Sequence, residues 1–219
     1  MLSTQKTADG SLTLFSERFQ ETYHSRHGAK TESLHVFIQH GLQYIASQSD
    51  EIRIGEIGLG TGLNAMLSCD AGRAIGKKIC YFAIEAFPVS PQIMNEVVAA
   101  FPEFSESRFL QLLYSEPGTI LKLLPEFEFV WFKSLWPAAN PFSDLDVLYY
   151  DAFAPGSQPE LWTHDAFYQA FQALRPGGIL VTYCAKGDVR RNMKSVGFEV
   201  EKLPGPPGKR EMTRAKRPD

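Results

Sequence analysis

A strand-like run that ends in closely spaced glycines is the first feature of the sequence that could do chemistry. Residues 52–58 have the apolar pattern of a buried strand, and Gly58, Gly60 and Gly62 follow as the chain opens toward a helix. Glycines at such a turn allow the backbone to pass very close to a ligand at the end of the strand. A dinucleotide fingerprint needs a small third residue, where this sequence has the bulky Leu63. The turn therefore predicts a nucleoside ligand and disfavours a pyrophosphate.

The spacing E-x-G-x-G-x-G, which begins at Glu56, resembles the S-adenosylmethionine motif of class I methyltransferases. In that motif Glu56 would face the methionyl ammonium, directly or through water, and Asn64 would also lie against the cofactor. Glu85 ends the next predicted strand, where a carboxylate can accept both ribose hydroxyls. At the following strand end, Ser115 stands where many relatives carry an acid that holds adenine, with Glu116 one residue on. The motif therefore predicts S-adenosylmethionine as cofactor but leaves the adenine contact unassigned.

A carboxylate and an aromatic ring follow the fourth predicted strand, in the run Asp151-Ala-Phe153-Ala-Pro. At the carboxyl edge of a central strand they would lie beside the cofactor's sulfur, so we count Asp151 among the cofactor-binding residues as well. An alkylamine has a pKa of about 10, so nearly all of it is protonated at neutral pH. Asp151 could hold such an amine, take its proton and aim its nitrogen, while Phe153 could stack on a flipped base. The alternative is a turn-capping acid beside a core ring.

The elements that must position these residues alternate between strands and helices. Strands are predicted at 52–58, 79–85, 109–114, 145–151 and 179–184, and helices at 63–74, 90–100, 117–124 and 163–174. This alternation builds a parallel sheet with helices on both faces. After a helix near 188–195, two strand-like runs at 198–203 and 210–215 have so short a connection that they must be antiparallel. The prediction is an α/β, Rossmann-like doubly wound sheet of the class I methyltransferase type, with a C-terminal antiparallel hairpin.

An N-terminal extension, residues 1–48, is predicted to pack on the methyltransferase domain, residues 49–219, so that the two form one structural unit. Within the extension, residues 10–30 read as a short β-rich lead-in, and a helix with its cap among residues 31–33 follows. The aromatic-rich segment 126–144 interrupts the alternation and is interpreted as an insertion, either an extra strand pair or a lid.

Composition and charge bound the class of protein. The chain has 219 residues, 44% of them hydrophobic and 21% charged, which is typical of one globular domain. No run approaches the roughly 18 apolar residues that span a membrane, and the first residues lack the apolar core of a secretory signal. Three cysteines without a C-x-x-C pair indicate a reduced cytoplasm and no metal site. The net charge is −3, yet from residue 186 onward ten Lys/Arg face five acids, which indicates either a phosphate-binding face or a solvated tail.

With these residues in view, the chain resembles the methyltransferase domain of the MnmC-type tRNA 5-methylaminomethyl-2-thiouridine biosynthesis proteins, in a stand-alone form without the oxidase domain. The marks most specific to that family are the lead-in that starts at Asp9, the D-A-F-A-P run, and Gly208-Lys-Arg-Glu-Met212. The resemblance implies methyl transfer from S-adenosylmethionine to the primary amine of 5-aminomethyl-2-thiouridine at the tRNA wobble position. It places Asp151 at the amine and Phe153 at the base. Because the sequence has no second glycine fingerprint, we expect a separate wobble-uridine-modifying complex that uses ammonium to supply the aminomethyl group.

The expected partner is therefore the anticodon loop of a tRNA. Its phosphates would be held by basic residues of the last zone, namely Lys186, Arg190, Arg191, Lys209 and Arg210. Tyr23, His24 and His35 could line the base pocket, although His35 on an apolar helix fits better as a hydrogen-bonded core residue.

Two other functions stay open at this stage. One is a S-adenosylmethionine-dependent methyltransferase that acts on a small amine, for which activity would not fall steeply with salt. The other is a non-catalytic relative that binds RNA or a protein partner, against which the intact glycine turn and Asp151 argue.

Overall fold

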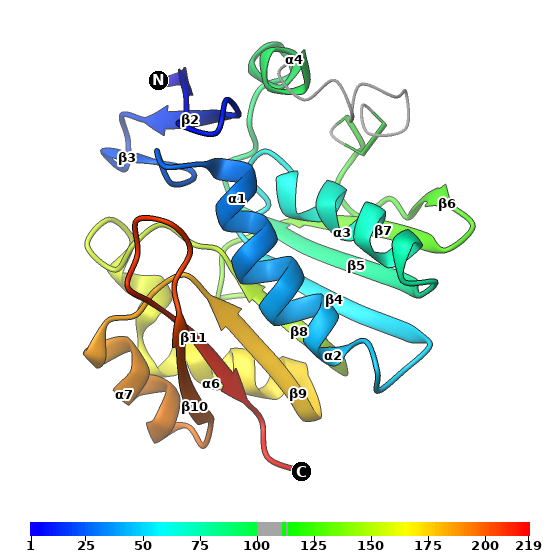
Figure 1. The fold of residues 1–219 in the computed structure, drawn as a ribbon, viewed down its shortest axis with the longest axis vertical. Helices are drawn as coiled ribbons and strands as arrows, with labels where there is room; N and C mark the ends of the chain where they lie inside the picture. The colour runs from blue at the N-terminus through cyan, green and yellow to red at the C-terminus, as the bar shows by residue number, and fades with distance from the viewer. Residues whose placement is uncertain (100–110, 113) are drawn as a thin grey trace.

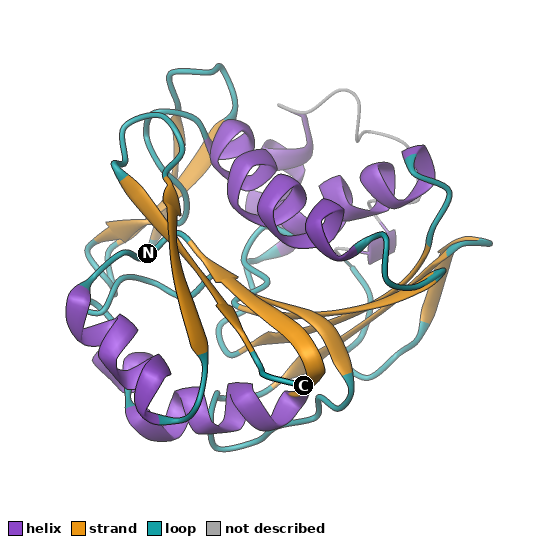
Figure 2. Ribbon diagram, turned by 60° about the horizontal axis from the view of Figure 1, so that its bottom comes forward, coloured by secondary structure: helices purple, strands orange, loops and turns teal. Residues whose placement is uncertain are grey.

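The computed structural model describes residues 1–99, 111–112 and 114–219, and its centre is a large sheet with helices on both faces (Figures 1 and 2). Among these residues the sheet has eight strands in the order β10-β11-β9-β8-β4-β5-β7-β6. Its parallel strands are β4 (Glu51–Ile57), β5 (Lys78–Glu85), β7 (Phe127–Lys133), β8 (Leu145–Tyr150) and β9 (Leu174–Thr182). The antiparallel strands are β6 (Leu121–Leu124), β10 (Glu199–Pro204) and β11 (Glu211–Lys216). The predicted fold class, with its C-terminal antiparallel hairpin, is confirmed.

Each face of the sheet is covered by its own layer of helices. One layer holds α3 (Leu63–Ala74) and a continuous helix made of α1 (Ala29–Ser33), the π-helical stretch η1 (Leu34–Leu42) and α2 (Gln43–Ile45), with α4 (Pro91–Ala99) near the edge. The other layer holds α6 (His164–Ala173) and α7 (Gly187–Ser195), with the short 3₁₀ helix η3 (Pro159–Trp162) before α6. As predicted, Thr163 caps α6, because its side chain accepts a hydrogen bond from the Ala166 N–H.

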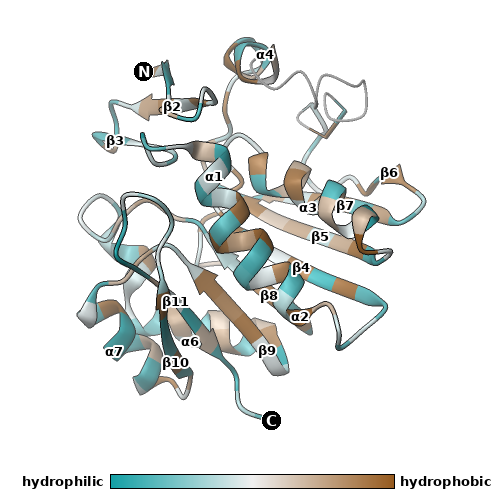
Figure 3. Cartoon of the chain, viewed as in Figure 1, coloured by the Kyte–Doolittle hydropathy of each residue, from teal (hydrophilic) through white to brown (hydrophobic). Residues whose placement is uncertain are grey.

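The core follows from the alternation of side chains along the central strands. In β8, Val147 and Tyr149 pack into the cluster beneath η1, whereas Leu148 and Tyr150 pack into the cluster beneath α6. All six residues of β8 are buried, as expected of a parallel strand covered on both faces. Figure 3 shows the hydrophobic residues concentrated in the middle of the sheet and the hydrophilic ones on the β10–β11 hairpin. The strand ends therefore rest on a tightly packed frame.

The N-terminal residues form a separate three-stranded antiparallel sheet beside the carboxyl ends of the large sheet (Figure 1). Its strands are β1 (Leu2–Lys6), β2 (Leu12–Ser16) and β3 (Glu21–Thr22). The helix that follows begins at Ala29, earlier than the sequence indicated. Its first turn is capped from outside, because the Asp9 carboxylate accepts from the Thr31 N–H at 3.1 Å and the Thr31 hydroxyl at 3.0 Å.

The third parallel strand lies in a different segment from the one predicted. Of the predicted strand at 109–114, Gln111 and Leu112 are helical, and residues 109, 110 and 113 lie outside the described residues. The strand is β7, inside the supposed insertion, and the predicted helix at 117–124 is replaced by its antiparallel neighbour β6. The reason is that aromatic residues of β7, such as Phe129, are buried against β5, and such residues favour strands.

None of the helices in the described part of the chain has both the length and the apolar content needed to cross a membrane.

Candidate active site

A cavity of about 260 Å³ opens at the carboxyl ends of β4, β5 and β8. This edge is where open α/β sheets bind ligands, because the loops that follow the strands diverge there. The walls come from the glycine turn, from the loops after β5, β7 and β8, and from the N-terminal extension. Among the lining residues are Gly58, Gly60, Glu85, Asp151, Phe153, Arg18, Phe19, Tyr23 and His24.

The glycine turn passes so close to the loop after β8 that a side chain would not fit. Gly58 has φ +90°, and a Cβ there would lie 2.6 Å from the backbone oxygen of Asp151. The Gly58 N–H donates to the Ile84 oxygen at 3.0 Å, which ties the turn to β5. Gly60 also lines the cavity, whereas Gly62 lies at the N-terminus of α3 and outside the cavity wall. The turn thus joins the two strand ends that the ligand must contact.

Glu85 is held in place by backbone N–H groups on both of its oxygens. Oε2 accepts from Gly60 at 2.9 Å and Oε1 from Phe87 at 2.7 Å. Burial raises the pKa of this carboxyl above its ordinary value. Each carboxylate oxygen has a second lone pair, so Glu85 can still accept ribose hydroxyls from the cavity side.

Glu56 lies behind the cavity wall rather than on it. Its side chain is fully buried, with Oε1 accepting from Asn64 Nδ2 at 2.8 Å and Oε2 from the Tyr81 hydroxyl at 2.9 Å. Burial, and then the charge of Asp151, raise the pKa of Glu56 well above its ordinary value. A cofactor ammonium in the cavity would therefore meet Asp151 before it met Glu56.

Asp151 also lines the cavity, and Asn64 connects it to Glu56. The Nδ2 group of Asn64 donates to Asp151 Oδ2 at 2.9 Å while it also binds Glu56. Burial, and then the negative charge of Glu32, raise the pKa of Asp151 to about 7. The Oδ1 atom of Asn64 is buried and has no hydrogen-bond partner among the described residues. Asn64 is 2% exposed and, like Glu56, is not among the residues that line the cavity.

Aromatic rings from both ends of the fold gather at the mouth of the cavity. Phe153 stacks on Phe19 with ring centroids 4.6 Å apart, and it meets the edge of Tyr23 at 5.0 Å. Nearby, the Arg18 guanidinium lies 3.8 Å from the centroid of the Phe87 ring. Arg18 and Phe19 were not predicted as site residues, because nothing in their local spacing places the lead-in over the strand ends.

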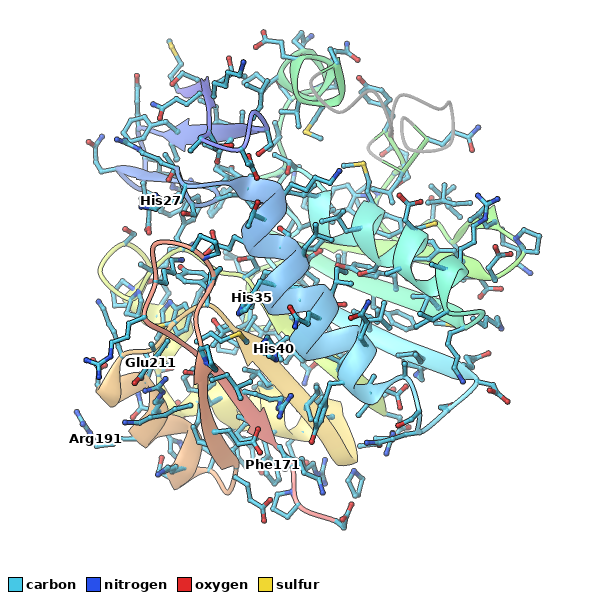
Figure 4. All side chains as sticks on the ribbon, in the orientation of Figure 1. His27, His35, His40, Phe171, Arg191 and Glu211 are labelled. Atoms are coloured by element: carbon cyan, nitrogen blue, oxygen red, sulfur yellow. The ribbon has the colours of Figure 1, made fainter. Side chains whose placement is uncertain are left out.

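The histidines divide between the cavity and the surface. His24 lines the cavity, and burial lowers its pKa to about 4, so its ring is neutral at pH 7. His35 lies instead on η1, where its Nε2 donates to the Pro204 oxygen at 2.9 Å and its ring packs on His40 (Figure 4). The described residues contain no group of three or more His, Cys, Asp or Glu side chains that could hold a metal ion.

A basic groove of about 470 Å³ lies next to the Asp151 loop. It is lined by Ala154, Pro155, Tyr183, Cys184, Ala185, Lys186, Lys209, Arg210 and Glu211. Three of the predicted phosphate ligands, Lys186, Lys209 and Arg210, are therefore brought together here. Arg191 is exposed on α7, at the edge of the molecule in Figure 4.

The placement of Arg190 in that phosphate-binding set is wrong. Its side chain is buried, and its guanidinium donates to Thr213 Oγ1 at 2.9 Å, to Glu211 Oε2 at 2.7 Å and to the Met212 oxygen at 3.0 Å. These three bonds attach α7 to β11. Arg190 therefore stabilises the hairpin and does not face the groove.

Comparison with known proteins agrees with this geometry. Residues 118–218 match a family described as S-adenosyl-L-methionine-dependent methyltransferase. The chain is 31% identical to the tRNA 5-methylaminomethyl-2-thiouridine biosynthesis bifunctional protein MnmC of Magnetococcus marinus, with 92% of this chain and 32% of that protein covered. The protein of the same name from Cupriavidus necator is 30% identical, with 91% and 32% covered. The chain thus spans about a third of the length of these relatives.

Two solved structures share the fold. The crystal structure of MNMC2 from Aquifex aeolicus superposes with a TM-score of 0.74 at 24% identity, covering 98% of this chain and 70% of that one. Spermidine synthase from Thermotoga maritima gives 0.59 at 12% identity, covering 99% and 69%. The chain is thus similar over most of its length to about a third of each MnmC-type protein, and it shares the fold of MNMC2.

Proposed function

We propose that the chain methylates the amine of 5-aminomethyl-2-thiouridine at the tRNA wobble position, using S-adenosylmethionine and giving 5-methylaminomethyl-2-thiouridine. The observation that carries this proposal is the position of Asp151, a half-buried carboxylate that shares one cavity with the glycine turn and Glu85. The substrate class comes from the names of the relatives. A separate reaction that adds a one-carbon unit and ammonium to the wobble uridine would supply the aminomethyl group.

The residues present fit S-adenosylmethionine. Glu85 offers free lone pairs to ribose hydroxyls, and Asp151 in the same cavity is a carboxylate that suits a methionyl ammonium. Ser115 is not an adenine ligand in this arrangement, because its oxygens accept from Trp131 Nε1 at 3.0 and 3.1 Å away from the cavity wall. Ser134 follows β7, the observed third parallel strand, and lines the cavity, which supports an adenine contact from the loop after β7.

Methyl transfer needs an unprotonated amine in line with the methyl donor. When bound, S-adenosylmethionine supplies a methyl group on a positively charged sulfur. Asp151 would hold the substrate ammonium and accept one of its protons, which frees the nitrogen lone pair. That lone pair forms the new N–C bond, and the electron pair of the broken S–C bond stays on sulfur. A pKa near 7 suits this role, because about half of the Asp151 carboxyl is then ionised near neutral pH and the carboxylate is basic enough to take a proton.

The neighbouring surfaces fit an RNA loop. Phe153, Phe19 and Tyr23 offer aromatic faces to a base splayed out of its stack. Lys186 and Arg210 line the adjacent groove, where they would attract backbone phosphates without reading sequence. A small free amine would need neither surface.

The decisive test is methylation of tRNA that carries 5-aminomethyl-2-thiouridine, with nucleosides analysed by mass spectrometry. We expect 5-methylaminomethyl-2-thiouridine to appear only with S-adenosylmethionine and active protein. Methylation of free small amines with the tRNA left unchanged would favour the small-amine enzyme instead. Absence of S-adenosylmethionine binding by calorimetry would favour the non-catalytic relative.

A further inference from the structure

A partly buried ion pair, between Glu32 and Lys209, joins the basic groove to the surroundings of Asp151. Glu32 lies on α1 with only 7% of its side chain exposed, and its Oε2 accepts from the Ser25 N–H at 2.8 Å. Its other oxygen pairs with the ammonium of Lys209, which comes from the turn between β10 and β11. Residues far apart in the sequence are thus held together at the side of the cavity.

Lys209 also touches the loop that presents Asp151. Its ammonium lies 3.9 Å from the centroid of the Tyr183 ring, and the Tyr183 hydroxyl donates to the backbone oxygen of Ala152 at 2.9 Å. The hairpin tip itself has little freedom here, because a Cβ on Gly208 would lie 2.3 Å from the His27 ring. A displacement of Lys209 would therefore change its contact with Glu32 and also its contact with Tyr183, which binds the backbone of Ala152 next to Asp151.

The charges around Asp151 make this pair matter for proton transfer. Besides burial, the groups that shift the pKa of Asp151 are Glu32 of α1, Asn64 of α3 and Lys209 of the hairpin. The charge of Asp151 in turn raises the pKa values of Glu56 of β4, Tyr81 of β5 and Tyr183 after β9. Of the charged pair, Glu32 raises the pKa of Asp151 and Lys209 lowers it. While Lys209 is paired with Glu32, its positive charge thus offsets the increase that Glu32 causes in the pKa of Asp151.

Resting on the proposed function, we propose that Glu32 and Lys209 are positioning residues through which RNA phosphate in the groove makes Asp151 a stronger proton acceptor. Lys209 lines the groove with Lys186 and Arg210, so a phosphate bound there competes with Glu32 for its ammonium. Once Lys209 is shared with phosphate, the charge of Glu32 is less compensated. The carboxylate would then become most basic when the substrate RNA is in place.

The test is a direct titration of the Asp151 carboxyl by ¹³C NMR, with the signal assigned by its loss in Asp151→Asn. Without RNA, we expect Glu32→Gln to lower the pKa of Asp151 and Lys209→Met to raise it, each by up to about one pH unit. Lys209→Arg keeps the charge and should titrate like the unaltered protein. Lys122→Met is the matched control, because Lys122 pairs with Glu128 at the β6 edge of the sheet.

A second titration adds an unmodified anticodon stem–loop RNA. We expect the RNA to raise the pKa of Asp151 in the unaltered protein and to have little effect in Lys209→Met. An unchanged pKa in folded Glu32→Gln, or bound RNA that leaves the Asp151 titration unmoved, overturns the proposal. These titrations do not require turnover, so they separate failure of the pair from failure of the methyltransferase assignment. The pH profile of single-turnover methylation should move in the same directions.

Discussion

At the residue scale, the surroundings of Asn64 give different roles to Glu56 and Asp151, two acids at strand ends that the sequence alone does not distinguish. One amide nitrogen binds both Glu56 and Asp151, yet Glu56 is sealed behind the wall and Asp151 faces the cavity. Only the second can touch a substrate, so the roles of structural and reacting carboxylate follow from burial. The chemistry is therefore expected to depend on Asp151.

Replacing Asp151 with Asn tests this dependence with little change of shape. We expect the single-turnover rate to fall by at least about 10², because the proton acceptor is gone, while S-adenosylmethionine affinity changes only a few-fold. Rapid-quench methylation and calorimetry measure the two effects. Asp165→Asn on the surface of α6 is the control, since its side chain is 94% exposed. Full activity in Asp151→Asn would remove this residue from the mechanism.

The raised pKa of Asp151 also has a cost in stability that depends on pH. Because its pKa is about 7 in the folded protein and 3.8 ordinarily, the folded state binds the proton more tightly than the unfolded state. The proton on Asp151 therefore stabilises the folded state at acidic pH, and this stabilisation is lost as the pH rises through about 7. When the pH is raised from 5 to 8, we expect the free energy of unfolding of Asp151→Asn to fall by roughly 1–3 kcal/mol less than that of the unaltered protein. Urea unfolding at both pH values checks this, and equal losses would contradict it.

At the scale of elements, the turn between β4 and α3 has a steric requirement that can be isolated. Gly58→Ala would put a methyl group against the Asp151 backbone, whereas Gly76→Ala has the same sign of φ and open space around it. We expect Gly76→Ala to cost only about 1–2 kcal/mol of strain. Gly58→Ala should cost more and also abolish S-adenosylmethionine binding, as measured by thermal denaturation and calorimetry. Equal behaviour of the two variants would show that the close approach is unimportant.

The same scale shows what the sequence could predict. The helix after the glycine turn was predicted with its observed bounds, since apolar spacing and glycines are local signals. The third strand was not, because the aromatic run of β7 becomes a strand by pairing with β5, and that pairing is not local. Likewise Asp151 could be found at a strand end, but Lys209 meets Glu32 only after folding. Arg190 was misplaced because charge alone does not reveal burial.

At the scale of the whole molecule, the described residues place the basic groove beside the cavity on one side of the protein. Changing Lys186 and Arg210 together to Ala should weaken RNA binding and reduce the salt dependence of its affinity by about 1.4 in log–log slope, as expected for two lost phosphate contacts. S-adenosylmethionine affinity should stay the same. Binding measured by anisotropy over a salt series, with Lys122→Ala as control, checks the prediction. An unchanged slope would place the RNA elsewhere.

The pairing of Glu32 with Lys209 has a consequence for the time at which the protein becomes competent during its synthesis. The wall around the cavity needs Arg18 and Phe19 from the extension, but the pair at its side closes only when the turn after β10 arrives. A nascent chain whose turn between β10 and β11 is still inside the ribosomal exit tunnel would therefore lack this ion pair. The proposed methyl transfer would then reach its full rate only after that turn has left the tunnel.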